Sequence, residues 1–230
     1  MNRDAIPSLY TIWAIVRKDL RIERRTRQTI SVMLMFSLVT VVLFNFALEA
    51  DMGAVQRVAT GLLWATIILA GTLGLNRSLA LESENQVIDA VLMAPVNRSA
   101  IYLGKVCSVG IFTLILEAVL VVIFIAVFEK PLWQPQVLLM LFLGTIGYVA
   151  AGVLVTSITI QTRTREVLLP VLLLPLALPV VLSASMAVGQ YMLPRAPEWA
   201  DVQSYFAIVA AYDLLMISVG MATYSYIVEA

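Results

Sequence analysis

Residues Val106–Phe128 read VCSVGIFTLILEAVLVVIFIAVF, a run of 23 residues with a single charged side chain, Glu117. A bilayer core about 30 Å thick is crossed by about 20 helical residues, so this run is long enough to span a membrane. The 230-residue chain holds five more such runs, at Thr29–Leu48, Val58–Leu75, Val137–Ile160, Val167–Val188 and Val202–Val228. They are continuously apolar rather than alternating, which favours helices over the strands of a membrane barrel. The sequence therefore predicts an all-α, polytopic membrane protein with six transmembrane helices.

The composition argues against a soluble enzyme. Charged residues make up 13% of the chain and apolar residues 61%, whereas a soluble domain is about 25% charged. Histidine is absent, which removes histidine bases, histidine-containing metal sites and the usual axial ligand of haem. The ten methionines could ligate haem, but methionine dispersed in apolar spans is mostly packing material, and Tyr102 and Cys107 are similarly weak candidates. We expect no catalytic site, no directly bound cofactor, no metal and no nucleic-acid partner.

The basic residues predict the orientation. Twelve of the 15 Lys and Arg residues flank the spans on one side, seven of them before the first span. Basic residues collect in cytoplasmic segments, so both termini are expected to be cytoplasmic. Trp133, Tyr191 and Trp199 fall at the opposite edges, where aromatic side chains anchor spans.

Residues 1–28 are expected to form an N-terminal cytoplasmic segment, and residues 29–230 the six-helix domain. Within the former, Ser8–Arg27 is too charged to span a membrane. Its apolar residues fall on one face of a helix, with the basic residues largely elsewhere; they are Leu9, Ile12, Trp13, Val16 and Leu20. Such a helix lies flat at the inner membrane surface, near anionic lipid headgroups. It either anchors the chain or acts as an elbow that relays motion to the first span.

The longest connection between spans, residues 76–105, is expected to lie on the cytoplasmic side. An apolar stripe of Val87, Ile88, Val91 and Leu92 predicts a short helix that Pro95 terminates. Glu82, Glu84 and Asp89 accompany this stripe. The stripe has to be buried against the protein's own helices, against lipid, or in a groove on a separate soluble subunit. The sequence alone leaves these alternatives open.

Residues Glu82–Val96 (ESENQVIDAVLMAPV), followed by Lys105, resemble the E-x-E-x-G-x-x-(D/E)-x-L-L-x-(S/A)-P…GK segment of type-2 ABC transporter permeases. Gln86 stands in place of the glycine, and Val91-Leu92 in place of the leucine pair. Three further elements are similar to the CcmB family of haem exporter permeases: Trp13 with Lys18-Asp19-Leu20-Arg21, the proline-rich fifth span, and Tyr212-Asp213-Leu214 in the last span. The resemblance covers essentially the whole chain.

The resemblance implies a membrane permease subunit in haem delivery for c-type cytochromes, located in the bacterial inner membrane. Because the chain has no GxxxxGK[ST] loop, a separate ABC ATPase subunit dimer has to supply the hydrolysis. A tryptophan-rich haem-handling membrane subunit, or a second permease copy, is a further implied partner beside the lipid bilayer. Haem is then a ligand that the complex transports or handles. Glu82, Glu84, Ile88, Asp89, Val91, Leu92 and Pro95 are the residues expected to couple the ATPase to the spans.

Two acids are predicted inside the membrane, Glu117 in the third span and Asp213 in the sixth. An ionised acid there costs roughly 2.5–3.5 kcal/mol, so neither is expected to face lipid. Each is either neutral and hydrogen-bonded to a neighbouring helix, or lines a cavity or a subunit interface. The candidate partners are Thr113, Ser218 and Tyr148.

Pro170, Pro175 and Pro179 each remove a hydrogen-bond donor from the fifth span. They predict either a static kink or a bent or re-entrant helix pair that changes shape during transport, and we favour the second. Three other functions stay open: a type-2 permease for another lipid-like or drug-like substrate, a proton-coupled secondary transporter that uses Glu117 and Asp213, and a passive scaffold. The 30-residue connection has no role in a secondary transporter.

Overall fold

The computed structural model describes residues 8–48, 52–84, 97–128, 132–159, 162, 165–193 and 197–229. These residues form helices and no strand; the helices are α1 (Ser8–Thr26), α2 (Gln28–Leu48), α3 (Met52–Glu84), α5 (Arg98–Phe128), α6 (Pro135–Thr159), α7 (Arg165–Tyr191) and α8 (Trp199–Glu229). Over the part of the chain that was searched, six helices, all but α1, are long and apolar enough to cross a membrane. The all-α, six-span prediction is confirmed.

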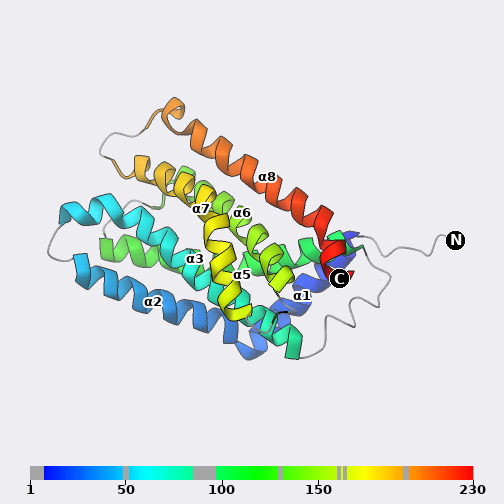
Figure 1. The fold of residues 1–230 in the computed structure, drawn as a ribbon. Helices are drawn as coiled ribbons and strands as arrows, with labels where there is room; N and C mark the ends of the chain where they lie inside the picture. The colour runs from blue at the N-terminus through cyan, green and yellow to red at the C-terminus, as the bar shows by residue number, and fades with distance from the viewer. Residues whose placement is uncertain are drawn as a thin grey trace.

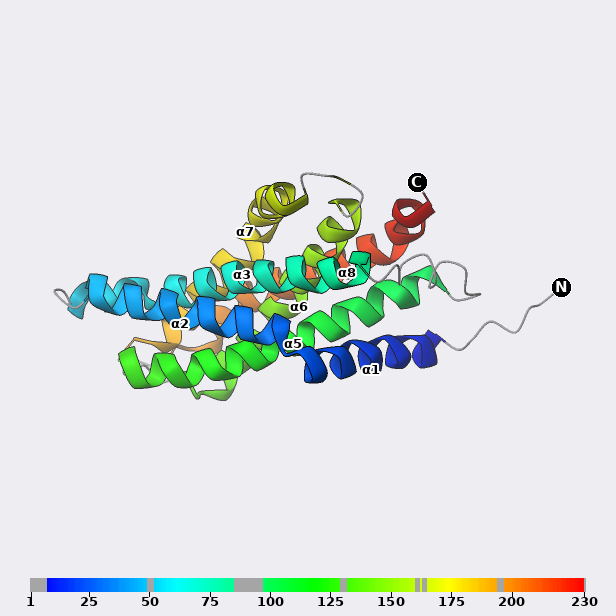
Figure 2. The same cartoon turned by 90° about the horizontal axis from the view of Figure 1, so that it is seen from below.

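Helix α6 lies in the middle of the bundle. It packs against α3, α5, α7 and α8 (Figure 1), and most of its side chains are buried. The start of α1, the start of α5 and the end of α8 lie at one end of the bundle (Figure 2), which we call the α1 end. Helix α1 packs along α5 at this end.

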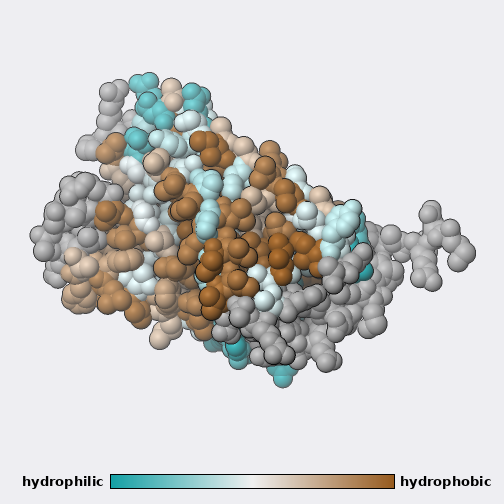
Figure 3. Space-filling model, viewed as in Figure 1, coloured by the Kyte–Doolittle hydropathy of each residue, from teal (hydrophilic) through white to brown (hydrophobic). Residues whose placement is uncertain are grey.

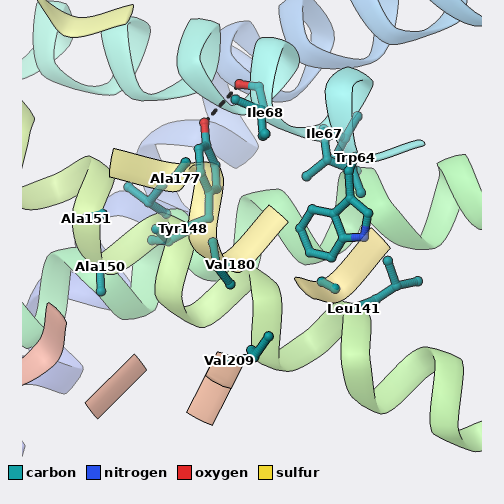
Figure 4. Packing of buried hydrophobic residues seen from close by; sticks show 14 of the residues in the cluster. Trp64, Ile67, Ile68, Leu141, Tyr148, Ala150, Ala151, Ala177, Val180 and Val209 are labelled. Atoms are coloured by element: carbon teal, nitrogen blue, oxygen red, sulfur yellow. Dashed lines mark hydrogen bonds between the residues drawn. The ribbon is translucent and has the colours of Figure 1, made fainter. Parts of the chain in front are cut away.

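The core around α6 combines large and small side chains. Figure 4 shows Trp64 and Ile67 of α3 against α6, and Tyr148 of α6 reaching back to the carbonyl oxygen of Ile68. The Tyr148 hydroxyl donates a hydrogen bond of 2.9 Å to that oxygen and lies 3.1 Å from the Thr72 hydroxyl. Because a buried phenol needs a hydrogen-bond partner, this contact fixes how α3 lies against α6.

The outer surface of the spans is apolar. Large apolar side chains of α2, α7 and α8 are exposed, and Figure 3 shows such a surface over one face of the bundle. A soluble protein of this size rarely exposes so much contiguous apolar area. This surface therefore suits contact with lipid.

Helix α1 buries a mixed polar and apolar face against the bundle and leaves part of its apolar stripe exposed. Thr11, Ile15, Asp19 and Glu23, each four residues from the next, are buried, together with Val16. Leu9 and Trp13 are instead 81% and 60% exposed. The buried acids Asp19 and Glu23 have partners on α5 and α2, so polar contacts help to hold this face against the bundle.

The third and fifth helices extend well beyond their apolar runs. Helix α3 continues to Glu84, and α5 already begins at Arg98, so much of residues 76–105 continues these two helices. At about 1.5 Å per residue, the 31 residues of α5 span about 46 Å, against about 30 Å for a bilayer core. Roughly ten residues of α5 therefore extend past the bilayer core. Those at its N-terminal end lie at the α1 end.

Helix α7 is one helix rather than a re-entrant pair. It runs without interruption from Arg165 to Tyr191 through Pro170, Pro175 and Pro179. The helix changes direction along its length (Figures 1 and 2), which fits a helix whose hydrogen-bond ladder has lost several donors. The expected re-entrant pair is absent from the described part of the chain, and the bend remains.

Candidate functional site

A buried carboxylate joins α1 to α5 at the α1 end of the bundle. Asp19 Oδ2 lies 3.0 Å from Lys105 Nζ and accepts a hydrogen bond of 2.7 Å from the Ser108 hydroxyl. The other oxygen, Oδ1, lies 3.0 Å from Lys18 Nζ. We call Asp19, Lys105 and Ser108 the α1–α5 clasp. It connects residues 86 positions apart in the sequence.

The surroundings of Asp19 favour its ionised form. Burial raises the carboxyl pKa, but the positive charges of Lys105 and Lys18 and the hydrogen bond from Ser108 lower it by more. The net result is a pKa below the ordinary value of 3.8. The ion pair between Asp19 and Lys105 therefore persists at neutral pH.

Gly104 allows the backbones of the two helices to come close beside the clasp. A Cβ atom placed on Gly104 would lie only 3.0 Å from Ile15 Cβ, closer than ordinary contact. A larger residue at position 104 would require Ile15 and α1 to shift by a few tenths of an ångström. The Gly104-Lys105 dipeptide thus supplies both the close approach and the cation.

A second carboxylate joins α1 to α2. Glu23 Oε1 accepts a hydrogen bond of 2.8 Å from the Ile30 backbone amide, and Oε2 accepts one of 3.2 Å from the Thr29 amide. The first amides of a helix have no partners within it, and a negative charge near them is favourable. Between the two helices Arg27 has φ of 54°, a left-handed conformation that sets the turn. Glu23 therefore fixes the direction in which α2 leaves α1.

The first turns of α5 are also attached to α6 and α8. The Tyr102 hydroxyl lies 3.0 Å from the Ala150 carbonyl oxygen and 3.3 Å from that of Met216. The Ser99 hydroxyl donates a hydrogen bond of 3.0 Å to the Met221 carbonyl oxygen. The start of α5 is thus held by α1 on one side and by α6 and α8 on the other.

The two intramembrane acids are buried and approach α6 from different sides. Glu117 of α5 accepts a hydrogen bond from the Thr145 hydroxyl, and Asp213 of α8 lies against Gly147. Residues two apart on a helix are separated by about 200° around its axis, so Thr145 and Gly147 face nearly opposite ways. Helix α6 therefore stands between the two acids, and they form no joint site.

The Tyr212-Asp213 pair connects α8 to both α6 and α7. The Tyr212 hydroxyl donates a hydrogen bond of 2.7 Å to the Leu176 carbonyl oxygen, between Pro175 and Pro179. The ring of Tyr212 lies against Gly147, and Asp213 Oδ1 has no hydrogen-bond partner among the described residues. A neighbouring helix thus supplies a polar contact within the proline-rich part of α7.

The predicted coupling residues fall mostly outside the described residues. Glu82 and Glu84 belong to the last turn of α3, and their side chains are not described. Ile88, Asp89, Val91, Leu92 and Pro95 lie between α3 and α5, outside the described residues. The structure describes the elements on either side of these residues, namely the end of α3 and the α1–α5 clasp near the start of α5.

The described side chains hold no metal-binding cluster of three or more His, Cys, Asp or Glu residues. The Tyr102 hydroxyl is engaged by two carbonyl oxygens, and Cys107 is exposed on the surface of α5.

The sequence matches the family model described as "CcmB protein" over residues 10–228. The chain belongs to the CcmB family. A CcmB-family relative, "Heme exporter protein B" of Rhodobacter capsulatus, is 27% identical over 201 residues, 86% of this chain and 88% of that protein. The protein of the same name in Escherichia coli K12 is 28% identical over 203 residues, 86% of this chain and 89% of that protein. The protein of this name in Bradyrhizobium diazoefficiens is 27% identical over 215 residues, 90% of this chain and 92% of that protein.

Membership of the CcmB family and the six apolar helices make the chain a multi-pass membrane protein of a haem-export family. Two short elements that lie far apart in the sequence contact each other in the structure. Lys18-Asp19 near the N-terminus and Gly104-Lys105 at the end of the permease-like segment form one contact. The sequence shows a carboxylate within a basic helix and a lysine at a membrane edge, but it does not indicate that these two residues form a pair.

Proposed function

We propose that this chain is the permease subunit of an ABC exporter complex for haem in the bacterial inner membrane, with the α1 end in the cytoplasm. The observation that carries the proposal is the match to the CcmB family over residues 10–228. The relatives are named haem exporters, and the matched regions cover 88% and 89% of their length. Six of the seven basic residues before the first span, from Arg17 to Arg27, lie in α1 or directly after it, as expected of a cytoplasmic segment.

The chain has no phosphate-binding loop of its own, so ATP hydrolysis reaches it through contact with a separate ATPase. The contact must lie in a cytoplasmic segment that is partly apolar. Residues 82–95 meet this condition. They begin in the last turn of α3 and continue towards the start of α5, and both of these long helices extend past the membrane core. A force on this segment acts directly on both helices.

We assign the docking contact to Ile88, Val91 and Leu92, with Glu82, Glu84 and Asp89 pairing to basic groups around the groove. Burial of three aliphatic side chains contributes roughly 1.5–3 kcal/mol each before ordering costs. Charges at the rim contribute less and mainly set orientation.

The buried acids give no support to a proton-coupled transporter. Glu117 is hydrogen-bonded to Thr145, and α6 separates it from Asp213. A proton route between the two would have to pass through the packed centre of the bundle. The geometry therefore favours a structural role for both acids within the permease.

The test is a Val91→Asp, Leu92→Asp double variant, expressed in a host strain that lacks its own copy of this chain. It should insert into the membrane but lose co-purification of the ATPase subunit and lose c-type cytochrome formation, measured by haem staining. A Gln161→Asp, Thr162→Asp variant places the same two charges in the connection between α6 and α7, which is also expected on the cytoplasmic side, and should retain both. Equal behaviour of the two variants would contradict the assignment.

A further inference from the structure

Helix α1 is held by buried carboxylates at two places along its length. Asp19, near its middle, is bound to Lys105 and Ser108 of α5. Glu23, one turn later, is bound to the first backbone amides of α2. Both acids lie on the buried face of α1, with exposed fractions of 8% and 4%. One short stretch of α1 therefore connects the start of α5 with the start of α2.

The α5 side of this connection follows closely in sequence on residues 82–95, which we call the coupling segment. Helix α5 begins at Arg98, and Lys105 follows two turns later on the same continuous helix. A hydrogen-bonded helix is stiff over such a length, so a displacement of its first residues moves Lys105 with it. The clasp, together with the close Gly104–Ile15 contact, transfers this displacement to α1.

The α2 side of the connection is stiff as well. Only Arg27 separates α1 from α2, and its backbone is left-handed. The two hydrogen bonds from Thr29 and Ile30 to Glu23 prevent α2 from swinging freely about this residue. A movement of α1 therefore becomes a tilt of the first span.

We propose that α1 works as a rigid strut that transmits displacement of the coupling segment to α2, with Asp19, Lys105 and Glu23 as its positioning residues. The proposal rests on the proposed permease function. Its specific claim is that the α1–α5 clasp stays closed while the complex transports, so that α1 and the start of α5 move as one body.

The first test breaks the clasp without leaving a buried charge unpaired. Asp19→Asn and Lys105→Met are introduced together, because removal of one partner alone strands the other charge. The variant should still bind the ATPase subunit on co-purification, whereas c-type cytochrome formation should fall about five-fold or more, the low end of typical coupling between sites. Lys18→Met, which removes the half-exposed cation beside Asp19 but leaves Lys105 in place, is the matched control and should stay near the parent level.

The second test closes the contact covalently. In a Cys107→Ser chain, which has no other cysteine, Ile15→Cys and Gly104→Cys place two sulfurs at the closest approach of α1 and α5. The Cβ–Cβ separation of 3.0 Å is slightly below the 3.5–4.5 Å of disulfides, so a small outward shift accommodates the bond. Oxidation should leave cytochrome formation unchanged, and should restore it in the Asp19→Asn, Lys105→Met background.

The outcomes separate the strut from the permease function. If oxidation of the cysteine pair abolishes cytochrome formation and reduction restores it, α1 has to leave α5 during transport and the strut is wrong. If the double variant supports full cytochrome formation, the clasp transmits nothing. If instead the parent chain neither binds the ATPase nor supports cytochrome formation, the proposed function fails. A merely structural clasp would lower the amount of assembled complex in step with cytochrome formation, which the co-purification measures.

Discussion

Replacement of Gly147 by alanine should disturb the contact between α6 and α8 far more than the chemical change suggests. A Cβ at this position would overlap the Asp213 carboxyl oxygen and lie 2.8 Å from Tyr212 Cδ1, short of an ordinary contact of 3.4 Å by about 0.6 Å. Because both obstacles are on α8, that helix has to move outward. The movement strains the Tyr212–Leu176 hydrogen bond.

The expected cost follows from three contributions. Overpacking costs about 1–3 kcal/mol, and weakening of the Tyr212–Leu176 bond about 0.5–1.5 kcal/mol, whereas alanine gains about 0.5–1 kcal/mol over glycine within a helix. We expect a net loss of about 1–3 kcal/mol in the free energy of unfolding. The matched control is Gly110→Ala, since a Cβ at Gly110 meets nothing within 4 Å. This control should be neutral or slightly stabilising.

Both variants are purified in detergent, and their unfolding by SDS in mixed micelles is followed by tryptophan fluorescence. The Gly147 variant should unfold at clearly lower SDS than the parent, and the Gly110 variant at the same or higher SDS. Equal unfolding curves for the two variants would refute the close packing of Asp213 and Tyr212 on α6.

Three further predictions concern the acids and the orientation. Glu117→Gln should keep parent-like stability, because the amide oxygen still accepts a hydrogen bond from the Thr145 hydroxyl. Glu117→Leu should unfold at lower SDS, because leucine leaves that hydroxyl without its acceptor. The reverse order of stability would contradict the hydrogen bond. Because the pKa of Asp19 is lowered by folding, its ionised form stabilises the protein above the unfolded-state pKa of about 4, and this stabilisation is lost as the pH falls through the folded-state pKa. The parent should therefore exceed Asp19→Asn in thermal stability at pH 7 and converge with it in acid. A constant difference from pH 7 to pH 3 would oppose this. In a Cys107→Ser chain, a cysteine at Asn97 should react with an impermeant thiol reagent only from the cytoplasmic side and one at Trp133 only from outside, and the opposite labelling would overturn the orientation.

The fold was predictable because it depends on length and composition. Six apolar runs of at least 18 residues are enough to predict six spans, and the structure has them. The boundaries were less predictable, since hydropathy falls where charges begin, but a helix does not end there. Residues Arg98–Lys105 carry two charges and are still helical, because α1, α6 and α8 give them partners outside the apolar core.

The packing of α1 illustrates what a linear pattern misses. Its apolar stripe includes Leu9 and Trp13, which are exposed, whereas the face buried against the bundle carries Asp19 and Glu23. A buried acid is favourable only with partners, and those partners lie on other helices. No periodicity within α1 reveals them.

The intramembrane acids show the same limit. Burial of Glu117 and Asp213 was predictable from the cost of exposing them to lipid. Thr145, the partner of Glu117, was not among the expected candidates, and Thr113 instead donates to the Val109 carbonyl within its own helix. Which hydroxyl reaches an acid depends on how the helices are rotated, which composition does not determine.

The central claim is that residues 82–95 contact an ATPase, and a photocrosslink tests it most directly. A photoreactive phenylalanine analogue replaces Leu92 in otherwise unaltered membranes, with Leu138, an exposed span residue, as the matched control site. After irradiation, the account predicts that the Leu92 site forms an adduct with the ATPase subunit, identified by mass spectrometry, and that the Leu138 site does not. An adduct of the Leu92 site with lipid or with this chain alone, in membranes that contain the ATPase, would contradict the account.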